Sequence, residues 1–236
     1  MPDVKVPKKW RPSLALLVTF VVGVLVILPF AALVAARVTS NQFARETEGN
    51  LHAQAAIYAQ IFANAYAQEA GDPTHGPTLT EQQQNRVSPD WHPVPKTLVA
   101  TNDTILSPRA DPLPTVVPPD PVYLAISDRM SAIATAARKT TLVGFLALDA
   151  SGNIIAKSGT DVGNLAHVDE VDRALSGDIV SVARWREEEY RNHSLRSLSR
   201  DTKFRVYVAH PVIVGDRVVG AIYLSRTPSN LNKYLF

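Results

Sequence analysis

The stretch RVYVAHPVIVGDRVVGAIYLSRTP, Arg205–Pro228, decides the fold that this sequence predicts. Two apolar runs in it meet at Gly215 and Asp216, a pair of residues that favours a tight turn between strands. The stretch therefore predicts a long antiparallel hairpin. Because side chains alternate along a strand, Arg205 and Tyr207 are expected on one face of the first strand, with the valines between and after them on the other.

A second hairpin is predicted earlier in the chain by GFLALDASGNIIAKSG, residues 144–159. Its first strand is apolar on both faces, which indicates an inner strand of a sheet covered on both sides. Apolar residues at helical spacing predict helices over 121–141 and 167–177, and DIVSVARWRE, residues 178–187, predicts one more strand. The predicted fold class is α+β, a five-stranded antiparallel sheet with helices packed on one face.

The amino-terminal stretch Leu14–Ala36 contains no charged residue. As a helix it would be about 34 Å long, enough to cross a bilayer. The alternative is a cleavable signal peptide, whose apolar core is typically shorter. Basic residues gather in the tail 1–13, so we expect the amino terminus in the cytoplasm, a transmembrane helix over 14–37 in the inner membrane, and the remainder on the extracytoplasmic, periplasmic side.

A long helix is predicted to continue outward from the transmembrane helix. Residues 42–71 contain no proline, and they carry an apolar stripe at helical spacing. The stripe suits packing on the chain's own sheet or on a second subunit, and we expect a homodimer through this membrane-proximal helix. The Pro-rich segment 72–121 is expected to be an extended loop without a role in the site, pinned across a domain that spans 38–226.

The composition argues against several classes of function. A net charge of +2 without a long basic run speaks against nucleic acid binding, and the absence of cysteine excludes disulfides and thiolate metal sites. No hydrolase motif and no metal-ligand spacing among the histidines is found, so we expect no catalytic residue, no metal and no cofactor. Asp169, Glu170 and Asp172 are interpreted as structural carboxylates at the start of a helix.

In this order the segments resemble the extracytoplasmic sensor module of bacterial two-component histidine kinases, the PAS-like class also called PDC or Cache. The likeness rests on GFLALDASGNIIAKSG, on DVGNLAHVDEVDRALSGD and on RVYVAHPVIVGDRVVGAIYLSRTP. It implies a PAS-like sheet and a function in signal sensing. It also implies that SRTP and residues 227–236 begin a helix leading to a second membrane span.

The sequence departs from that family after the sensor module. It contains no H-E-x-x-x-P phosphoacceptor motif and no Gly-rich nucleotide-binding loop. We therefore expect the sensing part of a histidine kinase, truncated before the second membrane helix, which would reach a response regulator only through missing cytoplasmic domains. The alternatives are a stand-alone single-pass binding or scaffold protein of the cell envelope, and the sensor part of a chemoreceptor or cyclase.

The segment 184–205 combines seven basic residues with four acidic ones. One interpretation is a solvated charged edge with internal ion pairs. The other is a pocket for a small anionic ligand, because guanidinium groups hold carboxylates through paired hydrogen bonds. Sensor modules of the resembled class bind small ligands between the sheet and the segments that cover it. By that resemblance the candidate ligand-binding residues are Arg184, Arg186, Tyr190, Arg205, Tyr207 and His210.

Overall fold

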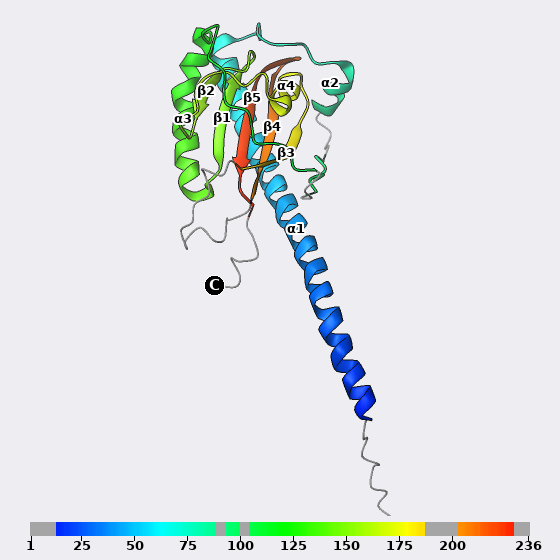
Figure 1. Ribbon diagram of the computed structural model, residues 1–236. Coiled ribbons are helices and arrows are strands. Elements are labelled where there is room, and N and C mark those ends of the chain that lie inside the picture. Colours follow the sequence, from blue (N-terminus) through cyan, green and yellow to red (C-terminus); the bar gives the residue numbers. More distant parts are fainter. Residues whose placement is uncertain (1–12, 88–92, 100–103, 187–202, 229–236) are drawn as a thin grey trace, which may run out of the picture. The chain divides into compact units, whose positions relative to one another are not determined.

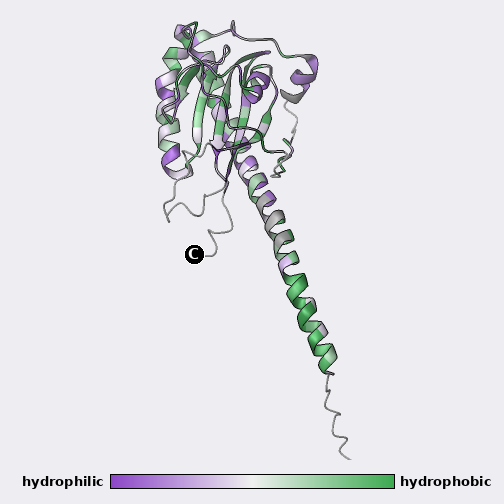
Figure 2. Cartoon of the chain, in the orientation of Figure 1, coloured by the Kyte–Doolittle hydropathy of each residue, from purple (hydrophilic) through white to green (hydrophobic). Residues whose placement is uncertain are grey.

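The computed structural model describes residues 13–87, 93–99, 104–186 and 203–228. The chain divides into two units, Met1–Thr39 and Ser40–Phe236, and helix α1 (Leu14–Ala70) contributes to both. In the first unit, the stretch Leu14–Ala32 is long and apolar enough to cross a membrane, although an amino-terminal signal sequence has the same properties. In Figure 2 the ribbon of this stretch is coloured almost entirely as hydrophobic.

The second unit is built on a five-stranded antiparallel sheet with the order β2-β1-β5-β4-β3 (Figure 1). The strands are β1 (Gly144–Asp149), β2 (Ile154–Lys157), β3 (Val180–Trp185), β4 (Phe204–Val214) and β5 (Arg217–Arg226). The predicted long hairpin is β4 and β5. Its turn contains Gly215 at φ 61°, a left-handed conformation that glycine adopts without strain. Because β5 pairs with β1 and β4 pairs with β3, the hairpin forms the centre of the sheet.

Helices cover both faces of the sheet. Helices α1 and α3 (Pro121–Thr141) share one apolar core with the sheet, which includes Phe62 and Met130. The short helix α4 (Asp169–Leu175) packs on the opposite face through Val171 and its neighbours. The α+β class with five antiparallel strands is confirmed. Helices on one face were expected, and α4 departs from this because the inner strands are apolar on both sides and so require cover on both.

Helix α3 begins and ends where the sequence predicts. The Asp120 carboxylate accepts a hydrogen bond from the backbone N–H of Val122 at 3.0 Å, and Pro121 occupies the first turn, a combination typical of a helix start. Leu142 ends the helix in a left-handed conformation at φ 56°. The buried face of α3 consists of Tyr123, Ile126, Met130 and Ala134.

The Pro-rich segment between α1 and α3 contains one short helix, α2 (Glu81–Val87), and otherwise extended chain. Isolated backbone bridges attach it to the domain at three points, between Thr78 and Arg217, between Leu106 and Arg184, and between Leu113 and Asn164. The segment is therefore pinned across the domain as expected. The expected helix after Pro228 and most of the charged segment, residues 187–202, lie outside the described residues.

Candidate functional site

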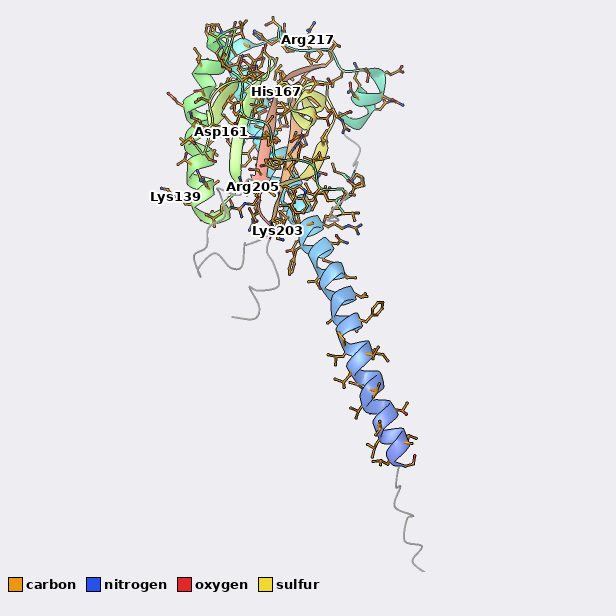
Figure 3. All side chains as sticks on the ribbon, in the orientation of Figure 1. Lys139, Asp161, His167, Lys203, Arg205 and Arg217 are labelled. Atoms are coloured by element: carbon orange, nitrogen blue, oxygen red, sulfur yellow. The ribbon has the colours of Figure 1, made fainter. Side chains whose placement is uncertain are left out.

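A cavity of about 490 Å³ lies over the face of the sheet that carries α4. Its floor is formed by the ends of β1, β3, β4 and β5. Its sides come from residues 108–111 of the Pro-rich segment, residues 158–161 after β2, and the last turn of α3. Arg205 on β4 and Asp161 after β2, both labelled in Figure 3, belong to this cavity. The Pro-rich segment thus contributes to the site, contrary to expectation.

Two tyrosines from the central hairpin form part of the cavity lining. The rings of Tyr207 and Tyr223 stack with centroids 5.5 Å apart and an angle of 19° between their planes. The Tyr223 hydroxyl donates a hydrogen bond to Glu170 Oε1 at 2.7 Å. Burial, together with the Glu170 carboxylate, raises the pKa of Tyr223 well above its ordinary value, so the phenol keeps its proton. The two stacked rings form an aromatic part of the lining, and both tyrosines are largely buried.

Beside the cavity, a buried ion pair joins α4 to β3. Arg184 donates from Nε to Glu170 Oε1 at 3.0 Å and from Nη2 to Glu170 Oε2 at 2.7 Å, which is a bidentate arrangement. Its Nη1 donates to the carbonyl oxygen of Ser107 at 3.1 Å. These bonds, and above all the hydrogen bonds to Glu170, raise the pKa of Arg184. Arg184 is therefore already neutralised, and it holds the Pro-rich segment against β3.

Arg205 lies directly across from Arg184 in the pairing of β3 with β4, but its hydrogen bonding differs from that of Arg184. Its side chain lines the cavity, and its Nε is buried without a hydrogen-bond partner in the described part of the chain. A buried N–H of a charged group without an acceptor is energetically costly, because water no longer solvates it. The cavity lining therefore includes a guanidinium whose Nε lacks an acceptor among the described residues.

The remaining charges of the cavity are mostly positive. Arg109 Nη1 lies 3.4 Å from Asp161 Oδ2; burial would lower the pKa of Arg109, but Asp161 raises it overall. Arg138 donates to the carbonyl oxygen of Ser158. Among the described residues, the charged lining consists of Arg109, Arg138, Arg186, Arg205, Asp111 and Asp161. This described part of the lining therefore carries more arginines than carboxylates.

The structure brings together some of the predicted site residues and separates others. Arg186, Arg205 and Tyr207 line the cavity, and Arg184 lies beside it in its pair with Glu170. His210 lies on β4 three residues beyond Tyr207, so its side chain is on the opposite, α1 face of the sheet, where burial lowers its pKa. Tyr190 lies outside the described residues.

Sequence reasoning did not identify four of the residues that form the site. Arg109, Arg138 and Asp161 come from three separate segments, and Tyr223 lies on a strand whose apolar pattern gave it no distinction. No local pattern marks them, because only the tertiary fold brings them together. Within the described residues, no group of three or more His, Asp or Glu side chains lies close enough together to hold a metal ion.

A scan against protein-family models finds no match, and a search of curated proteins finds none. Among solved structures, the chain is similar to the sensor domain of the histidine kinase DctB from V. cholerae, with 17% identity and a TM-score of 0.33 over 42% of this chain and 36% of that chain. It is also similar to the cofactor-binding GAF domain of the nutrient sensor CodY from Clostridium difficile, with 12% identity and a TM-score of 0.28 over 48% of this chain and 80% of that chain. Likenesses with TM-scores this low leave the function to be inferred from the cavity itself.

Proposed function

We propose that this chain is the extracytoplasmic signal-sensing part of a membrane-bound sensor histidine kinase, and that it binds a small anionic ligand in the cavity. The observation that carries the ligand proposal is Arg205, which lines a cavity whose described charged residues are mostly arginines, and whose buried Nε has no acceptor among the described residues. A carboxylate or similar anion in the cavity would accept hydrogen bonds from the Arg205 guanidinium and offset the positive charge of the arginines around it. The sensor assignment is supported by the sequence motifs and by the apolar helix at the amino terminus.

The cavity favours a compact anion with an apolar part. A volume of about 490 Å³ lies within the range of ordinary small-molecule sites. Arg205 and Arg138 supply donors for the anionic group, whereas the stacked rings of Tyr207 and Tyr223 form an apolar part of the lining.

Strand β3, which forms part of the cavity lining, is hydrogen-bonded to α1 on the other face of the sheet. Glu48 of α1 is fully buried, and its carboxylate accepts a hydrogen bond from Ser181 of β3 at 2.5 Å. It also accepts hydrogen bonds from the backbone N–H groups of Thr97 and Leu98, both at 3.1 Å. Strand β3 ends at the cavity, so a ligand that shifts β3 also acts on the helix that continues into the apolar stretch.

The experiment that tests the ligand proposal is a screen of small anions by thermal unfolding of the full chain in detergent. A ligand at about 100 times its dissociation constant adds about 2.7 kcal/mol of stability, which corresponds to a rise of roughly 5–11 °C in a chain of this size. We expect dicarboxylates, phosphates or sulfonates to produce such a rise, and we expect Arg205→Ala to abolish it. Arg173→Ala, which removes an exposed arginine of α4 away from the cavity, is the matched control.

A screen in which no anion raises the unfolding temperature would contradict the ligand proposal. So would a rise that survives in Arg205→Ala. Retention of the rise in Arg173→Ala shows that the effect belongs to the cavity and not to net charge. The stand-alone binding protein and the sensor part of a chemoreceptor or cyclase remain the alternatives to a kinase, and the coding sequence that follows the codon for Phe236 distinguishes them.

We also propose that the chain forms a homodimer through α1. Within the domain, the buried face of α1 packs on the chain's own sheet, and the opposite face leaves small and apolar side chains exposed, of which Ile57 is 61% exposed. Association of the full chain in detergent should therefore depend on concentration, and Ile57→Lys should shift it toward monomer. A chain that is monomeric at every concentration would contradict this proposal.

A further inference from the structure

The charges that flank the sheet are sorted by sign between its two ends. One end of the sheet is the end that lines the cavity, where β1 and β4 begin. There, the described residues that flank the strands or line the cavity include eight basic residues and two acidic ones. They are Arg109, Arg138, Lys139, Lys157, Arg186, Lys203, Arg205 and Arg226, with Asp111 and Asp161. The opposite end is flanked by Asp149, Asp178, Asp216 and Arg217. Among the described residues, basic side chains therefore gather at one end of the strands and acidic side chains flank the other.

Three residues at the cationic end are separate from the ligand cavity. Lys139 lies in the last turn of α3, Lys203 precedes β4, and Arg226 is the last residue of β5; we call these three residues the basic rim. None of them lines the cavity, and within the described part of the chain none of their side chains makes a hydrogen bond or an ion pair. Lys139 and Lys203 are exposed, and Figure 3 shows both at one end of the domain, with Arg217 at the other.

We propose that the basic rim binds the acidic phospholipid headgroups of the membrane that holds the chain. The rim is an open set of cations from three elements, and such a set suits an extended anionic surface and not a single small anion. This inference rests on the membrane attachment in the proposed function, but it does not depend on the ligand. It adds a second contact between the domain and the bilayer besides the α1 connection.

The chain itself makes the bilayer the nearest anionic surface. The apolar stretch ends at Ala36, and Ala44 is the first fully buried residue among those described in the domain, only eight residues later in the same continuous helix. Only eight residues of chain therefore separate the two. The part of α1 that belongs to the domain begins at the end where Lys139 and Lys203 lie (Figure 3). A short tether of this kind gives even weak charge attraction a high effective concentration.

The expected strength is modest and sensitive to salt. Each lysine or arginine near an anionic bilayer strengthens binding about fivefold, so Lys139 and Lys203 together contribute roughly 25-fold to the docked population. The attraction should disappear at high salt, because the side chains are exposed and fully screened there. A docked domain would also be held in a fixed orientation relative to the bilayer, which restricts the movement of α1.

The absence of cysteine in the chain makes a single-site reporter possible. Thr135→Cys places a donor fluorophore on an exposed position of α3, one turn before Lys139. The full chain is reconstituted in nanodiscs that contain an acceptor-labelled lipid, either in phosphatidylcholine alone or in an equal mixture with phosphatidylglycerol. We expect higher energy transfer in the anionic nanodiscs at low salt, and a loss of that difference in about 0.5 M salt, where the screening length falls to a few ångströms.

The comparison variant is Lys139→Ala with Lys203→Ala, and its matched control is Arg129→Ala with Arg173→Ala, because all four side chains are exposed. We expect the rim variant to lose most of the difference between the two lipids, and the control to keep it. Equal transfer in both lipids, or an unchanged difference in the rim variant, overturns the proposal. Suppression of the difference by millimolar dimethyl phosphate overturns it as well, because it would indicate a site for free anions.

Two failures are distinguishable in this design. A chain that does not enter nanodiscs at all removes the membrane attachment, and with it both the proposed localisation and this inference. A chain that enters nanodiscs without lipid-dependent transfer removes this inference alone. The ligand-induced rise in unfolding temperature should be unaffected by the rim variant, because neither lysine lines the cavity.

Discussion

Arg184 and Arg205 are paired neighbours on β3 and β4, and we predict opposite consequences of replacing each with methionine. Arg184 makes two hydrogen bonds to the fully buried Glu170 and a third to the Ser107 carbonyl oxygen. Arg184→Met therefore leaves Glu170 as a buried carboxylate without a counter-charge, with only the Tyr223 hydroxyl still donating to it, and loss of one partner of a buried ion pair typically costs about 3–5 kcal/mol. For a chain of this size, that corresponds to a fall of roughly 6–20 °C in unfolding temperature.

Arg205→Met removes a guanidinium whose buried Nε has no acceptor among the described residues, so without ligand it removes a cost as well as a contact. We expect an unfolding temperature within about 3 °C of the unmodified chain, since the net change should stay near 1 kcal/mol. The assay is thermal unfolding of the full chain and both variants, side by side in buffer free of carboxylate and phosphate. Destabilisation by Arg205→Met as strong as that by Arg184→Met would show that the Arg205 side chain makes stabilising bonds without ligand, contrary to the cavity proposal.

Two further predictions concern the fold. Burial lowers the pKa of His210 below its ordinary value of 6.5, so the unfolded chain binds this proton at a higher pH than the folded chain does. The stability that neutral His210 contributes should therefore be complete above pH 6.5 and be lost as the pH falls below it. His210→Gln should make the unfolding temperature less dependent on pH between about pH 7 and pH 5, and an unchanged dependence would contradict the assignment. A methyl group at Gly220 would lie 2.3 Å from the backbone oxygen of Leu148 and 3.2 Å from Phe62, so Gly220→Ala should lower the free energy of unfolding in denaturant by about 1–3 kcal/mol. Gly159→Ala is the control, because the nearest atom to its methyl group is Arg138 Nη1 at 3.9 Å. Equal denaturation midpoints for the two variants would refute this packing.

The parts of the fold that the sequence predicted are those set by local patterns. The turn at Gly215 and the alternation around Tyr207 were sufficient to predict the β4–β5 hairpin and which faces its residues occupy. Asp120 and Pro121 marked the start of α3. The placement of α4 was not predictable in the same way, because a helix of seven residues that is apolar on one side can pack on either face of a sheet that is apolar on both.

The candidate site was predicted only in part, because its residues meet through contacts between distant segments. Arg205 and Tyr207 followed from alternation on one strand. The pairing of Arg184 with Glu170, and its bond to Ser107, which lies 77 residues away, have no local signature. Glu170 was interpreted as a carboxylate suited to a helix start, which is correct for its position in α4, yet its burial against Arg184 depends on how α4 packs on β3.

The central claim is that the cavity binds a small anion through Arg205, and calorimetric titration tests it most directly. The strongest anion from the thermal screen is titrated into the full chain, into Arg205→Lys and into Arg205→Met. We predict saturable binding to the unmodified chain, weaker binding to Arg205→Lys because an ammonium cannot offer two parallel donors, and no measurable heat with Arg205→Met. Binding of equal strength to Arg205→Met would contradict the claim.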